Sequence, residues 1–180
     1  MVVGADGWID GVRRVPSPNN DERPADAEPT LLVLHGISLP PGEFGGDCIE
    51  RLFTNRLDPQ AHPYFATLAG VQVSAHFLIR RTGGIVQFVP VTRRAWHAGP
   101  SSWRGRSRCN DFSVGVELEG ADDAPYDERQ YTSLAALALA LADALPIGAC
   151  AAHSEIAPGR KSDPGPAFDW ALFHALIART

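Results

Sequence analysis

The sequence predicts a single α/β domain in which a central mixed β-sheet is flanked by helices. An apolar run at 31–35, a hairpin pattern at 73–90 and a long amphipathic helix after Pro125 carry this prediction. A hairpin needs an antiparallel strand pair, whereas strands that alternate with helices favour parallel neighbours, so both kinds of pairing are expected. With 180 residues, of which 44% are hydrophobic, the chain can bury one core. We therefore expect one domain over 1–180.

The N-terminal part divides into an arm and a strand. Residues 14–30 are rich in Pro and polar residues, so the arm 1–30 is expected to cross the surface irregularly, without regular elements. The run 31–35, LLVLH, is apolar on both faces and ends at His35. This pattern predicts a central strand covered on both sides, with His35 projecting from its end.

The segment 36–71 interrupts the regular pattern. One short helix is expected at 47–55, with Asp47 as its cap and three apolar side chains on one face, Ile49, Leu52 and Phe53. Structureless connections of this length are uncommon and often functional. We interpret the segment as a cover over a cleft, and the alternative is a rigid packed excursion.

Two strand patterns follow. Residues 73–90 read as two strands around an RTGG turn. In 110–120, period-two alternation places Val114, Val116 and Leu118 on one face and Gly115, Glu117 and Glu119 on the other. The polar face fits a solvent-exposed edge, yet Gly115 leaves space for another group to approach Glu117.

Two helices complete the chain. Asp127 and Gln130 are spaced as a capping box, and apolar residues recur at intervals of three and four along the helix they begin, at Tyr131, Leu134, Ala138, Leu141 and Leu145. Pro146 and Gly148 end it. A final helix is expected from about 167 to 178, with Pro166 near its start.

Charge and composition exclude several classes of protein. A formal net charge of -5 argues against general binding of nucleic acid or anionic membranes. The basic cluster at 103–108 fits either a solvated loop or a local site for a carboxylate ligand. The N-terminus lacks the features of a signal peptide, no run is long and apolar enough to span a bilayer, and the three cysteines fit no zinc motif. We expect a cytoplasmic protein, acting as a monomer, with no membrane or nucleic-acid partner.

A catalytic metal site is the main functional hypothesis from the residues. His153 and Asp163 flank a Pro/Gly-rich loop that also carries Lys161, and His35 at the strand end is the candidate third ligand. A catalytic zinc ion uses three protein ligands of His or carboxylate type and leaves its fourth position to water. Each fragment alone also fits an ordinary hydrogen-bonded side chain.

Five motifs in order extend this hypothesis to the whole chain: HGISLPPGEFGG, RLDPQAHPYFATLAGVQVSAHFLIRR, RAWHAG, NDFSVGVELEG and HSEIAPGRKSDPGPAFDW. Together they resemble the zinc N-acetylmuramoyl-L-alanine amidases of the amidase-2 family, most closely the cytosolic branch that acts on 1,6-anhydro-N-acetylmuramyl peptides. The resemblance implies zinc ligands at His35, His153 and Asp163. It implies catalytic roles for Glu117 as the proton carrier and Lys161 as the oxyanion donor.

The resemblance assigns the remaining roles less directly. Tyr64 would assist the oxyanion or order the water, or it is an ordinary packed aromatic. Trp96 would stack on the sugar, or it is a core residue. Arg108 and Asn110 would contact the substrate, with Arg108 suited to peptide carboxylates. Glu117 has an alternative as the buried partner of an arginine, and Lys161 as a solvated loop lysine.

The implied activity is cleavage of the amide bond between the lactyl group of 1,6-anhydro-N-acetylmuramic acid and L-alanine, with a muropeptide as the small-molecule substrate. This reaction serves peptidoglycan recycling and, in some hosts, keeps β-lactamase induction off. One alternative is a recognition module that binds muropeptides without cutting them, which the five intact site residues argue against. Another is a phage-type lytic amidase, which would favour Cys in place of Asp163. One departure from the family is Gly36, where Asn is common, so this position offers no side chain for a hydrogen bond to the substrate.

Overall fold

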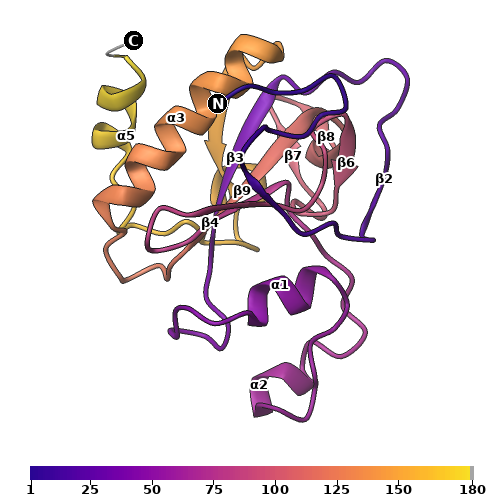
Figure 1. The fold of residues 1–180 in the computed structure, drawn as a ribbon, viewed down its shortest axis with the longest axis vertical. Helices are drawn as coiled ribbons and strands as arrows, with labels where there is room; N and C mark the ends of the chain where they lie inside the picture. Colours follow the sequence, from indigo (N-terminus) through magenta and orange to yellow (C-terminus); the bar gives the residue numbers. More distant parts are fainter. Residues whose placement is uncertain (179–180) are drawn as a thin grey trace.

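The computed structural model describes residues 1–178, and its centre is a six-stranded mixed sheet (Figure 1). The strand order across the sheet is β1 (Arg13–Arg14), β5 (Ile85–Gln87), β4 (Phe77–Ile79), β9 (Ser113–Glu119), β3 (Leu31–Ile37) and β10 (Ala149–Ala152). Neighbours from β4 to β10 run parallel, β5 is antiparallel to β4, and β1 is parallel to β5. The predicted mixed α/β architecture and the hairpin at 73–90 are confirmed.

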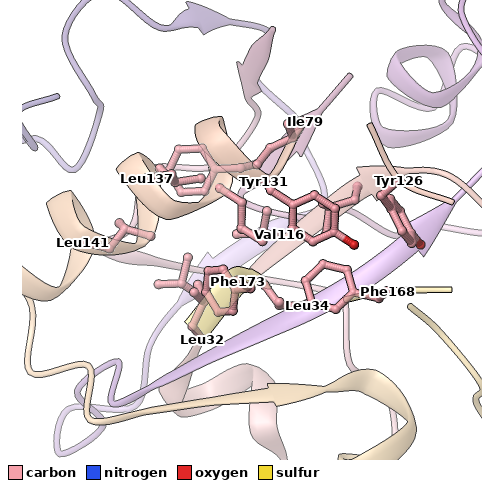
Figure 2. Packing of buried hydrophobic residues seen from close by; sticks show 14 of the residues in the cluster. Leu32, Leu34, Ile79, Val116, Tyr126, Tyr131, Leu137, Leu141, Phe168 and Phe173 are labelled. Carbon is pink, nitrogen blue, oxygen red and sulfur yellow. The ribbon is translucent and has the colours of Figure 1, made fainter. Parts of the chain in front are cut away.

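Two helices cover one face of this sheet. Helices α3 (Glu128–Ala144) and α5 (Trp170–Ile177) lie side by side, on the left of Figure 1. The main core fills the space between them and the strands, as Figure 2 shows for Leu32, Leu34, Val116, Tyr131, Leu137 and Phe173. Even-numbered residues of β3 and β9 point toward these helices, so the odd-numbered ones point away from them. Over residues 1–178, no helix has the length and apolar character needed to cross a membrane.

The helix ends follow the side chains that cap them. The predicted capping box at Asp127 and Gln130 is present. The last helix begins at Trp170 rather than near 167, because the Asp169 side chain accepts the backbone N–H of Leu172 and so marks the cap. Phe168 lies before the helix, where its ring packs against that of Tyr131 at a centroid distance of 5.2 Å.

The opposite face carries a second apolar layer that ends before the carboxyl edge of the sheet. Leu31 and Val33 pack there with residues of η1 (Cys109–Phe112), β10 and α4 (His153–Ile156). A small hairpin, β7 (Ser102–Trp103) and β8 (Arg106–Ser107), lies beside this layer. The next inward position on β3 is His35, so the apolar layer gives way to polar groups at the strand end.

The segment 36–71 is a packed lobe with two helices, α1 (Cys48–Phe53) and α2 (Pro63–Ala66), at the bottom of Figure 1. The predicted apolar face of α1 is buried, together with Leu39, Phe65, Leu78, Val86 and Phe88. Two details differ from expectation. Asp47 makes no side-chain cap hydrogen bond and instead pairs with Arg51 at 2.9 Å, and α2, capped by His62, was not predicted.

The arm is not irregular throughout, which corrects the prediction for 1–30. β1 adds to the sheet edge at β5, and β2 (Asn20–Glu22) pairs with β6 (Arg93–Ala95) in antiparallel fashion. These short strands form because sheet edges distant in sequence offer free backbone groups, which the local composition does not reveal. Arg23 then donates to the carbonyl oxygens of Val91, Asn110, Asp111 and Ser113.

Candidate metal centre and active site

The candidate site lies where three parallel strands end. In the sheet register His35 on β3 stands opposite Glu117 on β9, and Leu34 stands opposite Ala152 on β10. His153 follows Ala152 directly, so it reaches the level of His35. The carboxyl edge of parallel strands is the usual place for ligand sites in α/β sheets. Topology therefore brings together His35 and His153, which are 118 positions apart in sequence.

Three donor atoms converge at this edge. The Nδ1 atoms of His35 and His153 are 2.8 Å apart, and they lie 3.2 and 3.0 Å, respectively, from Oδ2 of Asp163. Both imidazoles are buried, and the Asp163 side chain is 15% exposed. Donors on a tetrahedral zinc ion are about 3.3 Å apart, so a small outward adjustment would place them at zinc-ligand distances.

The protonation pattern of His153 fits a cation. Its Nε2 atom lies 3.2 Å from the carbonyl oxygen of Ala98 and its Nδ1 atom 3.0 Å from Oδ2 of Asp163, and both oxygens only accept. A neutral imidazole has one proton, so it can donate to only one of them. With the proton on Nε2, a cation beside Nδ1 and Asp163 would satisfy the other pair. Two imidazole nitrogens and one carboxylate oxygen are a donor set that fits Zn²⁺.

The pKa shifts of the two other candidate ligands, His35 and Asp163, also fit a metal site. Burial lowers the pKa of His35 to about 4. Burial acts to raise the pKa of Asp163, but the interactions with the adjacent imidazoles of His153 and His35 outweigh burial and hold that pKa well below its usual range. At neutral pH His35 is uncharged and Asp163 is ionised, which are the states that bind metal.

Glu117 faces the same site with an unused oxygen. Its Oε2 is buried, and among residues 1–178 it has no hydrogen-bond partner. Burial, reinforced by the charge of Asp163, raises the pKa of Glu117 well above its usual range. The alternative of a buried ion pair with an arginine is not realised within the described chain. An unpartnered carboxyl group in a cleft is suited to carrying a proton.

A cavity of about 570 Å³ opens over these groups. The candidate ligands, Glu117 and Lys161 line it. Trp96, half-buried, and Tyr64 on α2, 41% exposed, line it as well. The segment 36–71 also contributes Ser38, Pro41, Gly42, Leu52 and Phe53 to its lining. Its expected role as a cover stays a prediction.

Comparisons with known proteins identify the family of the chain. The family described as N-acetylmuramoyl-L-alanine amidase matches residues 25–166. The chain belongs to this amidase family. It is 60% identical over 175 residues to the 1,6-anhydro-N-acetylmuramyl-L-alanine amidase AmpD of Escherichia coli K12, covering 96% of each chain, and 45% identical over 174 residues to that of Haemophilus influenzae, covering 95% of each.

Solved structures of amidases share the fold. The crystal structure of a selenomethionine AmpD derivative superposes with a TM-score of 0.96 at 58% identity, covering 98% of this chain and 99% of that one. The amidase AmiD from E. coli, solved with the substrate anhydro-N-acetylmuramic acid-L-Ala-D-γ-Glu-L-Lys, gives 0.61 at 30% identity, covering 86% of this chain and 60% of that one.

Two residues that the family resemblance assigned to substrate binding do not line the cavity. The Arg108 side chain is 69% exposed and pairs with Asp111 at 3.1 Å. Asn110 Oδ1 accepts the backbone N–H groups of His97 and Ala98 at 3.2 and 2.8 Å. Asn110 therefore holds the wall of the amidase site from behind, and its substrate contact, like that of Arg108, stays a prediction.

Neighbouring aromatic side chains occupy the space beside two glycines of the site. A Cβ atom on Gly115 would lie 2.4 Å from Cγ of His97, so the space expected beside Glu117 is taken by that imidazole. A Cβ atom on Gly36 would lie 2.4 Å from the hydroxyl oxygen of Tyr126. The hydroxyl group of Tyr126 donates to the carbonyl oxygen of Pro164, next to Asp163. Sequence reasoning did not find Tyr126, because its partners are distant in the chain.

Proposed function

We propose that this protein is a zinc-dependent amidase that hydrolyses the bond between the lactyl group of 1,6-anhydro-N-acetylmuramic acid and L-alanine. The observation that carries the proposal is the convergence of His35, His153 and Asp163 beside the unpartnered carboxyl group of Glu117. The near full-length similarity to amidases named for this substrate supports the choice of sugar. When bound, zinc supplies Lewis acidity, which polarises a carbonyl group and makes water more acidic.

Glu117 is the proton carrier in this proposal. Its buried carboxyl group, with a raised pKa, accepts a proton from the attacking water and then delivers one to the leaving nitrogen of L-alanine. The charge of a bound divalent cation opposes the effect of burial and favours the ionised form of Glu117 before attack. The carboxylate is therefore ready to act as a base at neutral pH.

The remaining cavity residues act on the substrate. Lys161 donates from its ammonium group to the carbonyl oxygen as negative charge develops there. Tyr64, on the lobe side of the cavity, assists at the same oxygen or orders the water. Trp96 offers an aromatic face for the sugar ring.

The cellular role follows from the substrate. Anhydromuropeptides are soluble fragments released from the cell wall, so we place this amidase in the cytoplasm, as a monomer, in peptidoglycan recycling. In hosts with an inducible β-lactamase, removal of these fragments keeps that response off. Preference for the anhydro sugar is expected because the internal bridge changes the shape of the ring, and a pocket walled by Trp96 discriminates by fit.

The decisive experiment is mass spectrometry of products from anhydromuropeptide incubated with purified protein. The expected result is free peptide and anhydro sugar, with activity lost in chelator and restored by Zn²⁺. The same peptide on reducing N-acetylmuramic acid is the matched control substrate. Equal kcat/KM on both sugars would refute the substrate assignment alone, whereas full activity in chelator would refute the zinc mechanism.

A further inference from the structure

The proposed metal site depends on which nitrogen of His35 carries the proton. His35 turns Nδ1 toward His153 and Asp163, while its Nε2 lies 2.9 Å from Nδ1 of His97. Both rings are buried. The contact between two imidazoles does not by itself decide which one donates, because each nitrogen can play either role.

The direction of the hydrogen bond between His35 and His97 is set by the contact of His97 with Ser113, farther from the site. Nε2 of His97 lies 3.2 Å from Oγ of Ser113, and that oxygen lies 2.6 Å from the carbonyl oxygen of Cys109. The carbonyl only accepts, so the single hydroxyl proton of Ser113 is committed to it. Ser113 must therefore accept from His97, and His97 carries its proton on Nε2.

The direction of this hydrogen bond fixes the next one toward the metal centre. Because Nδ1 of His97 carries a lone pair and no proton, it accepts the Nε2–H of His35. Nδ1 of His35 is left without a proton and faces the site as a donor to metal. The chain from the Cys109 carbonyl group through Ser113 and His97 thus selects one tautomer of His35.

The same backbone segment also orients the second histidine. The carbonyl group of Ala98 accepts from Nε2 of His153 and, at 2.6 Å, from Nη2 of Arg160. Asn110 fixes both residues of the pair by accepting their backbone N–H groups. The dipeptide His97–Ala98 therefore holds the outer nitrogen of each histidine ligand, and the close approach of Gly115 keeps the His97 ring in place.

We propose that His97 is a positioning residue that holds His35 in the tautomer with Nδ1 free, through the hydrogen bond that Ser113 directs. The proposal rests on the proposed zinc function. Partners of this kind orient ligands and raise their basicity, and their loss typically costs 10- to 100-fold in metal affinity.

Two variants of nearly equal shape distinguish the effect of the hydrogen bond between His35 and His97 from the effect of the packing of His97. His97→Asn keeps an acceptor near the position of Nδ1, whereas His97→Leu has a similar outline and no acceptor. Zinc affinity is measured by competition with a chromogenic chelator, and the Co²⁺ absorption spectrum reports ligand geometry. We expect about a 10- to 100-fold loss of zinc affinity and an altered Co²⁺ spectrum in His97→Leu, with both nearly restored in His97→Asn.

The outcomes distinguish the two proposals. If native protein fails to bind zinc, the proposed function fails. If it binds zinc and His97→Leu binds equally well, or if both variants lose the same affinity, the positioning role is overturned. Should the variants not fold, ¹⁵N NMR of the histidine side chains in native metal-free protein gives the answer. A proton on Nε2 of His35 supports the proposal, and a proton on Nδ1 overturns it.

Discussion

Replacement of Gly36 by alanine tests how closely the back of the amidase site is packed. The new Cβ atom would lie 2.4 Å from the Tyr126 hydroxyl oxygen, a separation that real Cβ contacts essentially never show. Tyr126 is 7% exposed, and its hydroxyl group donates to the carbonyl oxygen of Pro164 at 2.9 Å, so it has little freedom to move. Overpacking of this kind costs about 1 to 3 kcal/mol of folding free energy. We expect Gly36→Ala to lose that amount.

A double-mutant cycle with Tyr126→Phe tests whether the Tyr126 hydroxyl group is what the new methyl group meets. Tyr126→Phe alone should cost about 1 kcal/mol, because it removes one buried hydrogen bond. In that background the atom that the new methyl group meets is gone, so Gly36→Ala should cost at least about 1 kcal/mol less than in native protein. Urea unfolding of the four metal-free proteins at pH 7 measures this coupling. An equal cost of Gly36→Ala in both backgrounds would show that the hydroxyl group is not what excludes a side chain.

Other predictions address the chemistry and the acid stability. Asp163→Asn should weaken zinc binding, measured by chelator competition, because a neutral amide is a poorer ligand than a carboxylate. Glu117→Ala should keep one zinc per chain and lose turnover; retained turnover would contradict its role as proton carrier. Lys161→Met should lower kcat by about 100- to 1000-fold, or roughly 2.7 to 4 kcal/mol, with zinc still bound, and an unchanged kcat would remove it from the mechanism. Burial, aided by Arg23, lowers the pKa of His76 to about 3, so the unfolded chain binds that proton first. Stability should fall by up to about 1.4 kcal/mol per pH unit as pH drops below about 6.5, and urea midpoints of His76→Asn should be less dependent on pH.

The parts of the site that lie on strands could be predicted from sequence. His35 ends an apolar run, and the end of a buried strand points at the carboxyl edge of the sheet. Glu117 shares its face with Gly115 and Glu119 through period-two alternation, and in the structure this face meets the cavity at Glu117. For Glu117 local periodicity fixes the direction of the side chain. The run before His35 is apolar on both faces, so only its place late in the strand could be predicted, and the strand continues to Ile37.

The parts that depend on long-range pairing could not be derived from local pattern. β10 lies parallel to β3, and only this pairing brings His153 beside His35; family resemblance supplied what the spacing did not. The contacts of His97 with Ser113 and Gly115 arise from packing against β9, which the motif around His97 does not reveal. Asn110 lies in η1, and local pattern did not reveal its contacts with the backbone of His97 and Ala98; its substrate contact, implied by the resemblance, stays a prediction.

The polar groups of the site divide into an inner set with protein partners and an outer set that faces the cavity. The inner set includes Nε2 of His35, which contacts Nδ1 of His97, and Nε2 of His153, which contacts the carbonyl oxygen of Ala98. The Nδ1 atoms, Oδ2 of Asp163 and Oε2 of Glu117 face the site, and within residues 1–178 Oε2 of Glu117 has no hydrogen-bond donor. Leaving buried acceptors unmatched costs stability, and a fold keeps them only where surrounding contacts determine their position. The hydrogen bonds on the protein side thus hold the open acceptors in the arrangement that the proposed metal and amide substrate require, which is the physical content of a preorganised site.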